Sequence, residues 1–205
     1  MAGKLPPPAR QSNMGIVMKR LALISLAALL LAPLAAHAQA TDTAAIAAQQ
    51  QAMRKLDWMH GVWRGPAVSQ SPQGEHRVTQ TERIGGFLGG TLTVMEGKGY
   101  NPDGSVGFNA LGVVSYDAST KSYWLTSWAL GHGGKFAMTI TDSGYVWEIP
   151  AGPQTIRYTA TVANGVWTEV GDYIAAGQPP RRFFTMTLTR IGDSAWPAAG
   201  GIARE

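Results

Sequence analysis

The sequence contains no cysteine, and this absence excludes several kinds of chemistry. Disulfide frameworks, thiolate nucleophiles, cysteine zinc sites and thioether-linked haem all require this residue. The sequence also lacks the nucleophile-elbow pattern G-x-S-x-G, the phosphate-binding P-loop, the dinucleotide fingerprint and the H-E-x-x-H zinc motif. The classes of enzyme that those motifs mark therefore receive no support from the sequence.

Acidic residues are missing from the first part of the chain. Residues 1–38 hold Lys4, Arg10, Lys19 and Arg20 but no aspartate or glutamate. The whole chain has 17 basic and 13 acidic residues, so removal of this segment leaves 17 − 4 = 13 of each sign and no net charge. A neutral chain without a basic run has no electrostatic footprint for nucleic acid, and we expect no nucleic-acid partner.

The same segment has the composition of a signal peptide. Lys19-Arg20 give it a positive start, residues 21–34 form a short apolar run, and Ala36-His37-Ala38 supplies the small-x-small cleavage pattern. The apolar run is too short for a good membrane span, so we expect no integral membrane protein. We expect cleavage near Ala38 and a periplasmic or secreted product. Met18 is a more natural start than Met1, which indicates an over-extended start over residues 1–17.

Glycine and proline are absent from residues 41–56, which are rich in alanine and glutamine. This composition favours a helix with Thr41 or Asp42 as its N-cap. The predicted organisation is a signal peptide over 1–38, a helical lead-in over 39–57, one β domain over 58–192 and a tail over 193–205, clasped at Trp196.

Beyond Trp58, short runs rich in valine, threonine and aromatic residues alternate with clusters of glycine, asparagine, aspartate and proline. This alternation of strand-forming and turn-forming segments is typical of antiparallel strands. Asn101-Pro102-Asp103-Gly104 and Asn164-Gly165 are specific turn signals. Ten strands are predicted, over 61–69, 75–84, 87–97, 106–116, 121–130, 134–141, 144–149, 154–163, 166–175 and 181–191.

Ten consecutive strands joined by short turns predict an all-β, up-and-down antiparallel barrel after a short N-terminal helix. Closure of the barrel removes the edge strands that would otherwise pair with other chains. A β-sandwich is the alternative, although its crossovers usually need longer connections. A barrel of this kind is wide enough to hold a small ligand.

Gly61, Trp63 and Arg190 resemble the calycin signature, a G-x-W motif at the first strand with a late arginine over the indole. More narrowly, the chain resembles the exported bacterial "domain of unknown function 1579" family. The residues that carry this resemblance are Leu56–Gly65, Gly85–Gly90, Gly112–Asp117 and Phe184–Leu188. The resemblance implies a calycin-like barrel, similar to lipocalins and nitrobindins, without an assigned reaction. It also implies a cation–π contact between Arg190 and Trp63.

Nitrobindin-like barrels also begin with G-x-W-x-G and bind haem through a histidine near the C-terminus. This sequence departs from that pattern, since its last histidine is His132 and residues 154–191 contain none. Haem is therefore not expected, and no other cofactor is indicated.

Seven tryptophans are many for a chain of this size, and they suggest either an aromatic pocket or a core filled by large rings. Trp124 and Trp128 share a strand parity and are predicted to line one face of the pocket together. Trp167, Tyr158 and Arg157 complete the predicted ligand contacts.

Titratable residues in the later strands offer a second interpretation. If the Trp167 face is interior, Glu169 enters the cavity and needs a partner such as Arg157 or Arg182. Glu169, Tyr173 and His132 are then candidates for acid–base catalysis. No two histidines have the spacing of a metal motif, and no metal site is predicted.

Three functions remain open from the sequence. The first is an exported barrel that binds a small apolar or aromatic molecule. The second is an isomerase, cyclase or lyase that works without a cofactor through acid–base residues in the barrel. The third is an interaction protein of the cell envelope whose barrel is filled by side chains.

Overall fold

The computed structural model describes residues 42–196. The expected signal peptide, its cleavage site and the tail after Trp196 lie outside the described residues. The described segment begins with helix α1 (Thr43–Met53), which continues into the 3-10 helix η1 (Arg54–Met59). Asp42 caps α1 by accepting a hydrogen bond from the backbone N–H of Ala45 at 2.9 Å. Neither helix in this part of the chain combines the length and apolar character needed to cross a bilayer.

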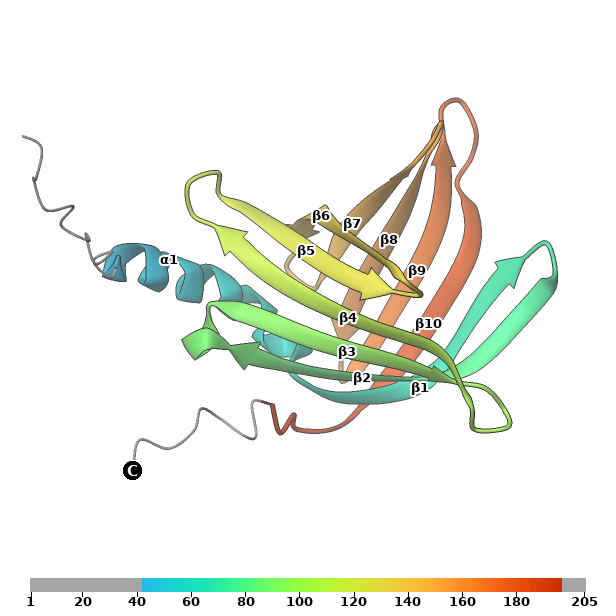
Figure 1. Cartoon of the computed structure of the whole chain (residues 1–205), viewed down its shortest axis with the longest axis horizontal. Coiled ribbons are helices and arrows are strands. Elements are labelled where there is room, and N and C mark those ends of the chain that lie inside the picture. The colour runs from blue at the N-terminus through green and yellow to red at the C-terminus, as the bar shows by residue number, and fades with distance from the viewer. Residues whose placement is uncertain (1–41, 197–205) are drawn as a thin grey trace, which may run out of the picture. The chain divides into compact units, whose positions relative to one another are not determined.

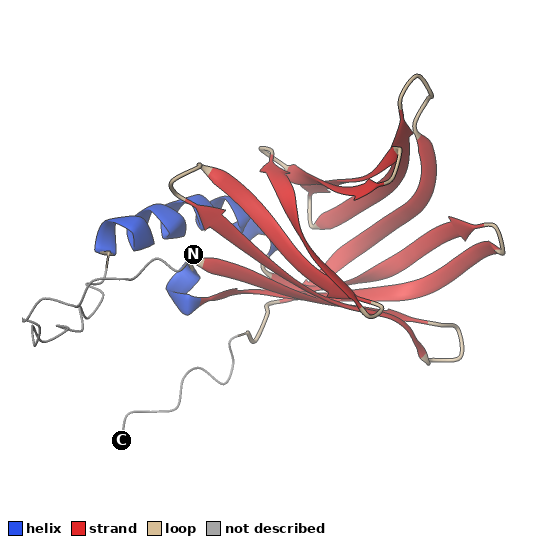
Figure 2. Cartoon of the chain, turned by 45° about the horizontal axis from the view of Figure 1, so that its top comes forward, coloured by secondary structure: helices blue, strands red, loops and turns tan. Residues whose placement is uncertain are grey.

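Ten antiparallel strands follow and close into one barrel, in which each strand pairs with its sequence neighbours and β10 returns to β1 (Figures 1 and 2). The predicted fold class is confirmed. The strands are β1 (Gly61–Ser71), β2 (Gly74–Phe87), β3 (Leu92–Tyr100), β4 (Val106–Asp117), β5 (Ser122–Ala129), β6 (His132–Ile140), β7 (Gly144–Ala151), β8 (Gln154–Ala163), β9 (Val166–Ala175) and β10 (Arg181–Gly192).

The two ends of the barrel differ. At one end, which we call the closed end, α1 and η1 lie against the barrel (Figure 1). Leu56 and Met59 of η1 are fully buried there, and the Trp63 indole N–H donates to the carbonyl of Met59 at 2.8 Å. The other end, which we call the mouth, carries the five turns that follow the odd-numbered strands, from β1–β2 to β9–β10.

Gly61 explains why the G-x-W motif begins with glycine. Its φ of +143° is rarely adopted by residues with a side chain, and a Cβ atom there would lie 2.8 Å from Nε of Arg190. Arg190 pairs with Trp63 in the register of β1 and β10, as the calycin resemblance implies. Its guanidinium, however, hydrogen-bonds to the carbonyl of His60 at 3.2 Å and pairs with Asp193. No cation–π contact with Trp63 is found in the described part of the chain.

The predicted starts of the third and the sixth strands differ from the observed ones. The predicted strand over 87–97 begins later, because Leu88–Gly90 form the short 3-10 helix η2 with Gly89 and Gly90 at φ of +67° and +89°. Gly85, which falls between the predicted strands 75–84 and 87–97, lies within β2. His132, expected in a turn, is the first residue of β6.

One ladder of the barrel is much shorter than the others. β6 and β7 pair only through Met138–Trp147, Thr139–Val146 and Ile140–Tyr145, which lie near the closed end. Residues 132–137 of β6 and 148–151 of β7 take no part in that ladder. We call this unpaired stretch the β6–β7 seam.

Candidate functional site

Strand register defines which side chains face the inside of the barrel. Alternation along each strand places Trp63, Ile84, Val114, Leu125 and Leu188 inward, and all five are buried. These residues fill the half of the barrel near the closed end. Toward the mouth, inward-facing aromatic side chains stay partly exposed. We call this part of the inner face the lumen.

Two glutamates occupy the inner face between the packed half and the lumen. Glu169 of β9 pairs in register with Met186 and Ala160, both buried, and is itself 8% exposed. Glu82 of β2 pairs with Trp63 and shares its inward parity. Each carboxyl affects the pKa of groups around the other, so the two belong to one cluster. We call Glu82, Glu169, Gln80 and Tyr145 the acid cluster.

Glu169 is surrounded by donors rather than by a cation. The Tyr145 hydroxyl donates a short hydrogen bond to its Oε2. Burial raises the pKa of Glu169 to about 7, against the hydrogen bond from Tyr145 and the nearby indole N–H groups of Trp167 and Trp147, which favour the charged form. Burial, the charge of Glu169 and the hydrogen bond to it also raise the pKa of Tyr145 well above its usual value, so this phenol stays a donor.

Glu82 is the weaker acid of the cluster. Burial raises its pKa to about 8; the hydrogen bond from Gln80 Nε2, 2.7 Å from Oε1, opposes this rise, and nearby Glu169 and Glu96 add to it. Gly97 makes the room for this carboxyl, because a Cβ atom there would lie 2.6 Å from Oε1 of Glu82. Glu82 is half-buried and Glu169 is buried, and both therefore keep their protons to a higher pH than an exposed glutamate does.

Aromatic rings form one wall of the lumen above the acid cluster. Trp147 of β7 stacks on Tyr158 of β8, with ring centroids 4.5 Å apart and planes within 9°. Phe136 lies 5.4 Å from Trp147 across the β6–β7 seam. A register shift in β10 brings both Phe183 and Phe184 against Tyr158, at 5.9 and 6.0 Å. The lumen thus combines an apolar wall of flat aromatic rings with the polar groups of the acid cluster.

Trp124, Trp128 and Arg157, predicted to contact the ligand, do not face the lumen. Trp124 and Trp128 do share a strand face, but their neighbour Leu125 is the inward residue, so both indoles lie outside. Lys135 covers Trp124 at 4.6 Å from its ring centroid, and Trp128 is 49% exposed.

Arg157 is likewise on the outer face, where its Nε pairs with Glu148 at 2.6 Å. Arg182 pairs with Asp172 at 2.6 Å. Neither arginine compensates Glu169, although the sequence suggested them as its partners. The inward face of β8 and β9 carries Tyr158, Trp167 and Glu169 instead.

The other two catalytic candidates lie toward the mouth. Tyr173 is half-buried between Phe183, at 4.5 Å, and the guanidinium of Arg181, also at 4.5 Å. His132 is exposed at the start of β6. The structure therefore does not bring Tyr173, His132 and Glu169 into one constellation. Within residues 42–196, no three histidine, aspartate or glutamate side chains gather in a way that could hold a metal ion.

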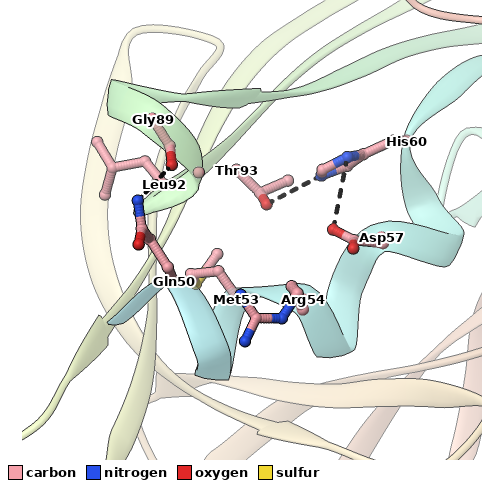
Figure 3. Close-up of a pocket in the computed structure, with 9 residues that line it drawn as sticks. Gln50, Met53, Arg54, Asp57, His60, Gly89, Leu92 and Thr93 are labelled. Carbon is pink, nitrogen blue, oxygen red and sulfur yellow. Dashed lines mark hydrogen bonds and ion pairs between the residues drawn. The ribbon is translucent and has the colours of Figure 1, made fainter. Parts of the chain in front are cut away.

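A hollow of about 260 Å³ lies outside the lumen beside α1, η1 and η2 (Figure 3). His60 Nε2 lies 3.3 Å from Thr93 Oγ1, and its Nδ1 lies 3.8 Å from Asp57 Oδ1. The order of these groups resembles a nucleophile, base and orienting acid. However, Thr93 is only 1% exposed, and burial lowers the pKa of His60 despite the opposing charge of Asp57. The arrangement ties η1 to β3.

Another hollow lies on the outer face near the mouth, beside β4 and β5. Leu111, Trp128 and Leu130 expose 40%, 49% and 69% of their surface around it. They form an apolar patch on the outside of the barrel, and the acid cluster does not contribute to it.

The sequence analysis missed Glu82, Gln80, Tyr145 and Trp147. A signal for the first two was present, because Val78 and Ile84 share their parity and both are apolar. In β7, Tyr145 and Trp147 share one parity with the apolar Ile149, which was a similar signal. Nothing in either strand alone, however, indicates that the two glutamates meet across the barrel.

Comparison with solved structures supports the fold. Sixteen protein chains of known structure match. One is Rv2717c from M. tuberculosis, which is 12% identical, with a TM-score of 0.52 over 68% of this chain and 97% of that one. At this identity the likeness shows a shared fold alone. No family model matches the chain, and no curated protein matches it.

Proposed function

We propose that this protein binds a small, largely aromatic or apolar molecule in the lumen. The observation that carries the proposal is the combination of the stacked Trp147–Tyr158 wall with the acid cluster beneath it. Ligand sites in proteins are typically apolar cavities with a few convergent polar groups whose pKa values are perturbed. The lumen has both properties on one inner surface.

The proposal can be tested with N-phenyl-1-naphthylamine, a neutral dye that fluoresces in apolar sites. Trp147→Leu removes one ring of the wall and should raise the dissociation constant at least about tenfold, the effect of roughly 1.4 kcal/mol of lost contact. Trp124→Leu removes an outer-face ring of the same size and should leave the constant unchanged. Circular dichroism checks that both variants are folded. Equal effects of the two substitutions, or no binding by the wild type, would contradict the proposal.

A second candidate function is acid–base catalysis on the bound molecule. It is favoured by the pKa values of about 7 and 8 at Glu169 and Glu82, since groups that titrate near neutral pH exchange protons efficiently. The test is exchange of deuterium from D₂O into a carbon of the molecule that copurifies with the protein. Exchange that is lost in Glu169→Gln would support catalysis, and its absence in the wild type would refute it.

We also propose that the barrel works outside the cytoplasm and belongs with the "domain of unknown function 1579" proteins. The leader-like composition of residues 19–38 and the G-x-W opening support this. The intact mass of the protein from its native host should correspond to a chain beginning at Gln39. A mass that retains the leader would refute export by cleavage.

A further inference from the structure

We infer that the lumen ligand carries an organic ammonium group, which Glu82 and Glu169 receive while Trp147 and Tyr158 pack on its apolar part. This inference rests on the proposed function, because it specifies the chemical class of the ligand in the same site. It is argued from charge, from hydrogen-bonding capacity and from the aromatic wall.

The first argument is charge. No lysine or arginine among residues 42–196 forms an ion pair with Glu82 or Glu169. Cations that do form ion pairs have other partners: Arg77 with Glu75, Lys98 with Glu96, Arg157 with Glu148, Arg182 with Asp172 and Arg190 with Asp193. Ionisation of either carboxyl in this setting without a counter-charge is costly, and a bound cation would relieve that cost.

The second argument is unused hydrogen-bonding capacity. An ionised carboxylate offers about four acceptor sites. Within the described residues Glu82 accepts one hydrogen bond, from Gln80. Glu169 accepts one, from the Tyr145 hydroxyl. Buried polar groups are rarely left unpaired, so oxygens of both carboxyls remain open to a further donor. An ammonium group brings three donors to these oxygens.

The third argument is the wall. Aromatic faces attract cations through their quadrupole, and tryptophan does so most strongly. Trp147 and Tyr158 lie on the lumen side of the acid cluster, and the charge of Glu169 adds to burial in raising the pKa of Tyr158 to about 12. A carboxylate ligand would instead be repelled by the negative charge of the ionised glutamates and by the aromatic faces. A neutral alcohol would gain neither the ion pair nor the cation–π contact.

The inference predicts that binding of the ligand releases protons, in addition to its effect on affinity. Because Glu82 and Glu169 hold protons near neutral pH, a bound cation should drive part of them off. Titration calorimetry in two buffers of different ionisation enthalpy measures the protons released. A neutral ligand of the same shape should release almost none.

The experiment compares 2-phenylethylamine, 2-phenylethanol and phenylacetate as competitors of N-phenyl-1-naphthylamine at pH 7.5. The amine should displace the dye at least about tenfold better than the alcohol, with proton release. Glu82→Gln and Glu169→Gln should each remove most of this advantage while the dye still binds. Glu148→Gln, an outer-face carboxyl paired with Arg157, is the matched control and should retain it.

The outcomes separate the two proposals. If the dye binds but the alcohol or the acid competes as well as the amine, the ammonium inference is overturned and the lumen site stands. If the amine keeps its advantage in both glutamine variants, the assignment of the acid cluster is overturned. If neither the dye nor any competitor binds, the lumen site fails, and the inference fails with it.

Discussion

Glu82 and Glu169 are the residues that depart most from what folding alone would select. The inner face of this barrel has room for apolar side chains at both positions, yet it carries carboxyls whose charged forms are disfavoured by burial. Replacement of buried polar groups by well-packed apolar ones is often neutral or stabilising. The acid cluster is therefore better explained by a ligand or a reaction than by stability.

The pKa values give this residue-scale argument a measurable consequence. A carboxyl with a pKa raised in the folded state keeps its proton where the unfolded chain, near 4.5, has lost it. The free energy of unfolding should therefore fall as pH rises from 6.5 to 8, by at most about 1.4 kcal/mol per pH unit for each titrating carboxyl. His60, whose pKa is lowered, acts in the opposite direction but only below about pH 6.5.

Urea denaturation across this pH window tests the prediction. The double variant Glu82→Gln/Glu169→Gln should show a flat profile, whereas Glu148→Gln should keep the slope of the wild type. A wild-type stability that rises between pH 6.5 and 8 would contradict the raised pKa values and, with them, the description of the acid cluster.

At the scale of elements, α1 is held on the barrel by few contacts. Met53 is its only buried residue within the described chain. Three side-chain hydrogen bonds add to it: Tyr123 hydroxyl to the Ala52 carbonyl at 2.8 Å, Gln50 to the Gly89 carbonyl at 2.8 Å, and Gln49 to the Tyr116 carbonyl at 3.4 Å. An element anchored in this way should open without unfolding the strands.

Tyr123→Phe should therefore destabilise α1 by about 1 kcal/mol, the usual contribution of one hydrogen bond. Hydrogen exchange followed by mass spectrometry should show faster exchange over residues 43–53 and unchanged rates in β8 and β9. Tyr100→Phe, at the mouth end of β3, is the control. Equal acceleration in all strands would mean that α1 is part of the same cooperative unit as the barrel.

The element scale is also where the sequence was most informative. Nine of the expected strands fall close to observed ones because turn chemistry marks their ends, as at Asn164-Gly165, where both residues have positive φ. The early start assigned at residue 87 fails because Phe87 and Leu88 are apolar and β-compatible, while the glycines that follow select a 3-10 turn.

The site was less predictable than the strands. Parity along one strand correctly groups Glu169 with Trp167 and groups Trp124 with Trp128, but it cannot say which group faces inward. That choice depends on packing from the whole ring of strands, which buries Leu125 and exposes Trp128. The meeting of Glu82 with Glu169 depends on closure between β1 and β10, a contact that no local pattern encodes.

At the scale of the whole barrel, the β6–β7 seam is the weakest part of the wall. Every other neighbouring pair of strands shares at least six register pairs, whereas β6 and β7 share three. Phe136 and Trp147 contact each other across the seam where the backbone ladder has ended. Side-chain packing therefore replaces backbone hydrogen bonds along this part of the barrel.

Seam-side amides among residues 133–137 and among Glu148, Ile149 and Ala151 should accordingly exchange at least about tenfold faster than amides in the central parts of β1 and β10, because backbone groups outside a ladder are poorly protected. The remaining amides of these residues belong to the ladders with β5 and β8. Nuclear magnetic resonance or mass spectrometry of the exchanging protein gives these rates directly. Uniform protection around the barrel would show that the seam is closed in solution. Trp147→Leu should widen the difference, since it removes the contact with Phe136.

The seam also bears on how copies of this protein behave at high concentration. Unpaired strand edges are templates for pairing with other chains, and natural proteins often protect them with lysine or proline. Lys135 stands on the β6 side of the seam, and Pro150 stands on the β7 side. Replacement of both by valine would remove this protection from the two strand edges. The double variant should then pair with other copies into intermolecular sheets more readily than the wild type does.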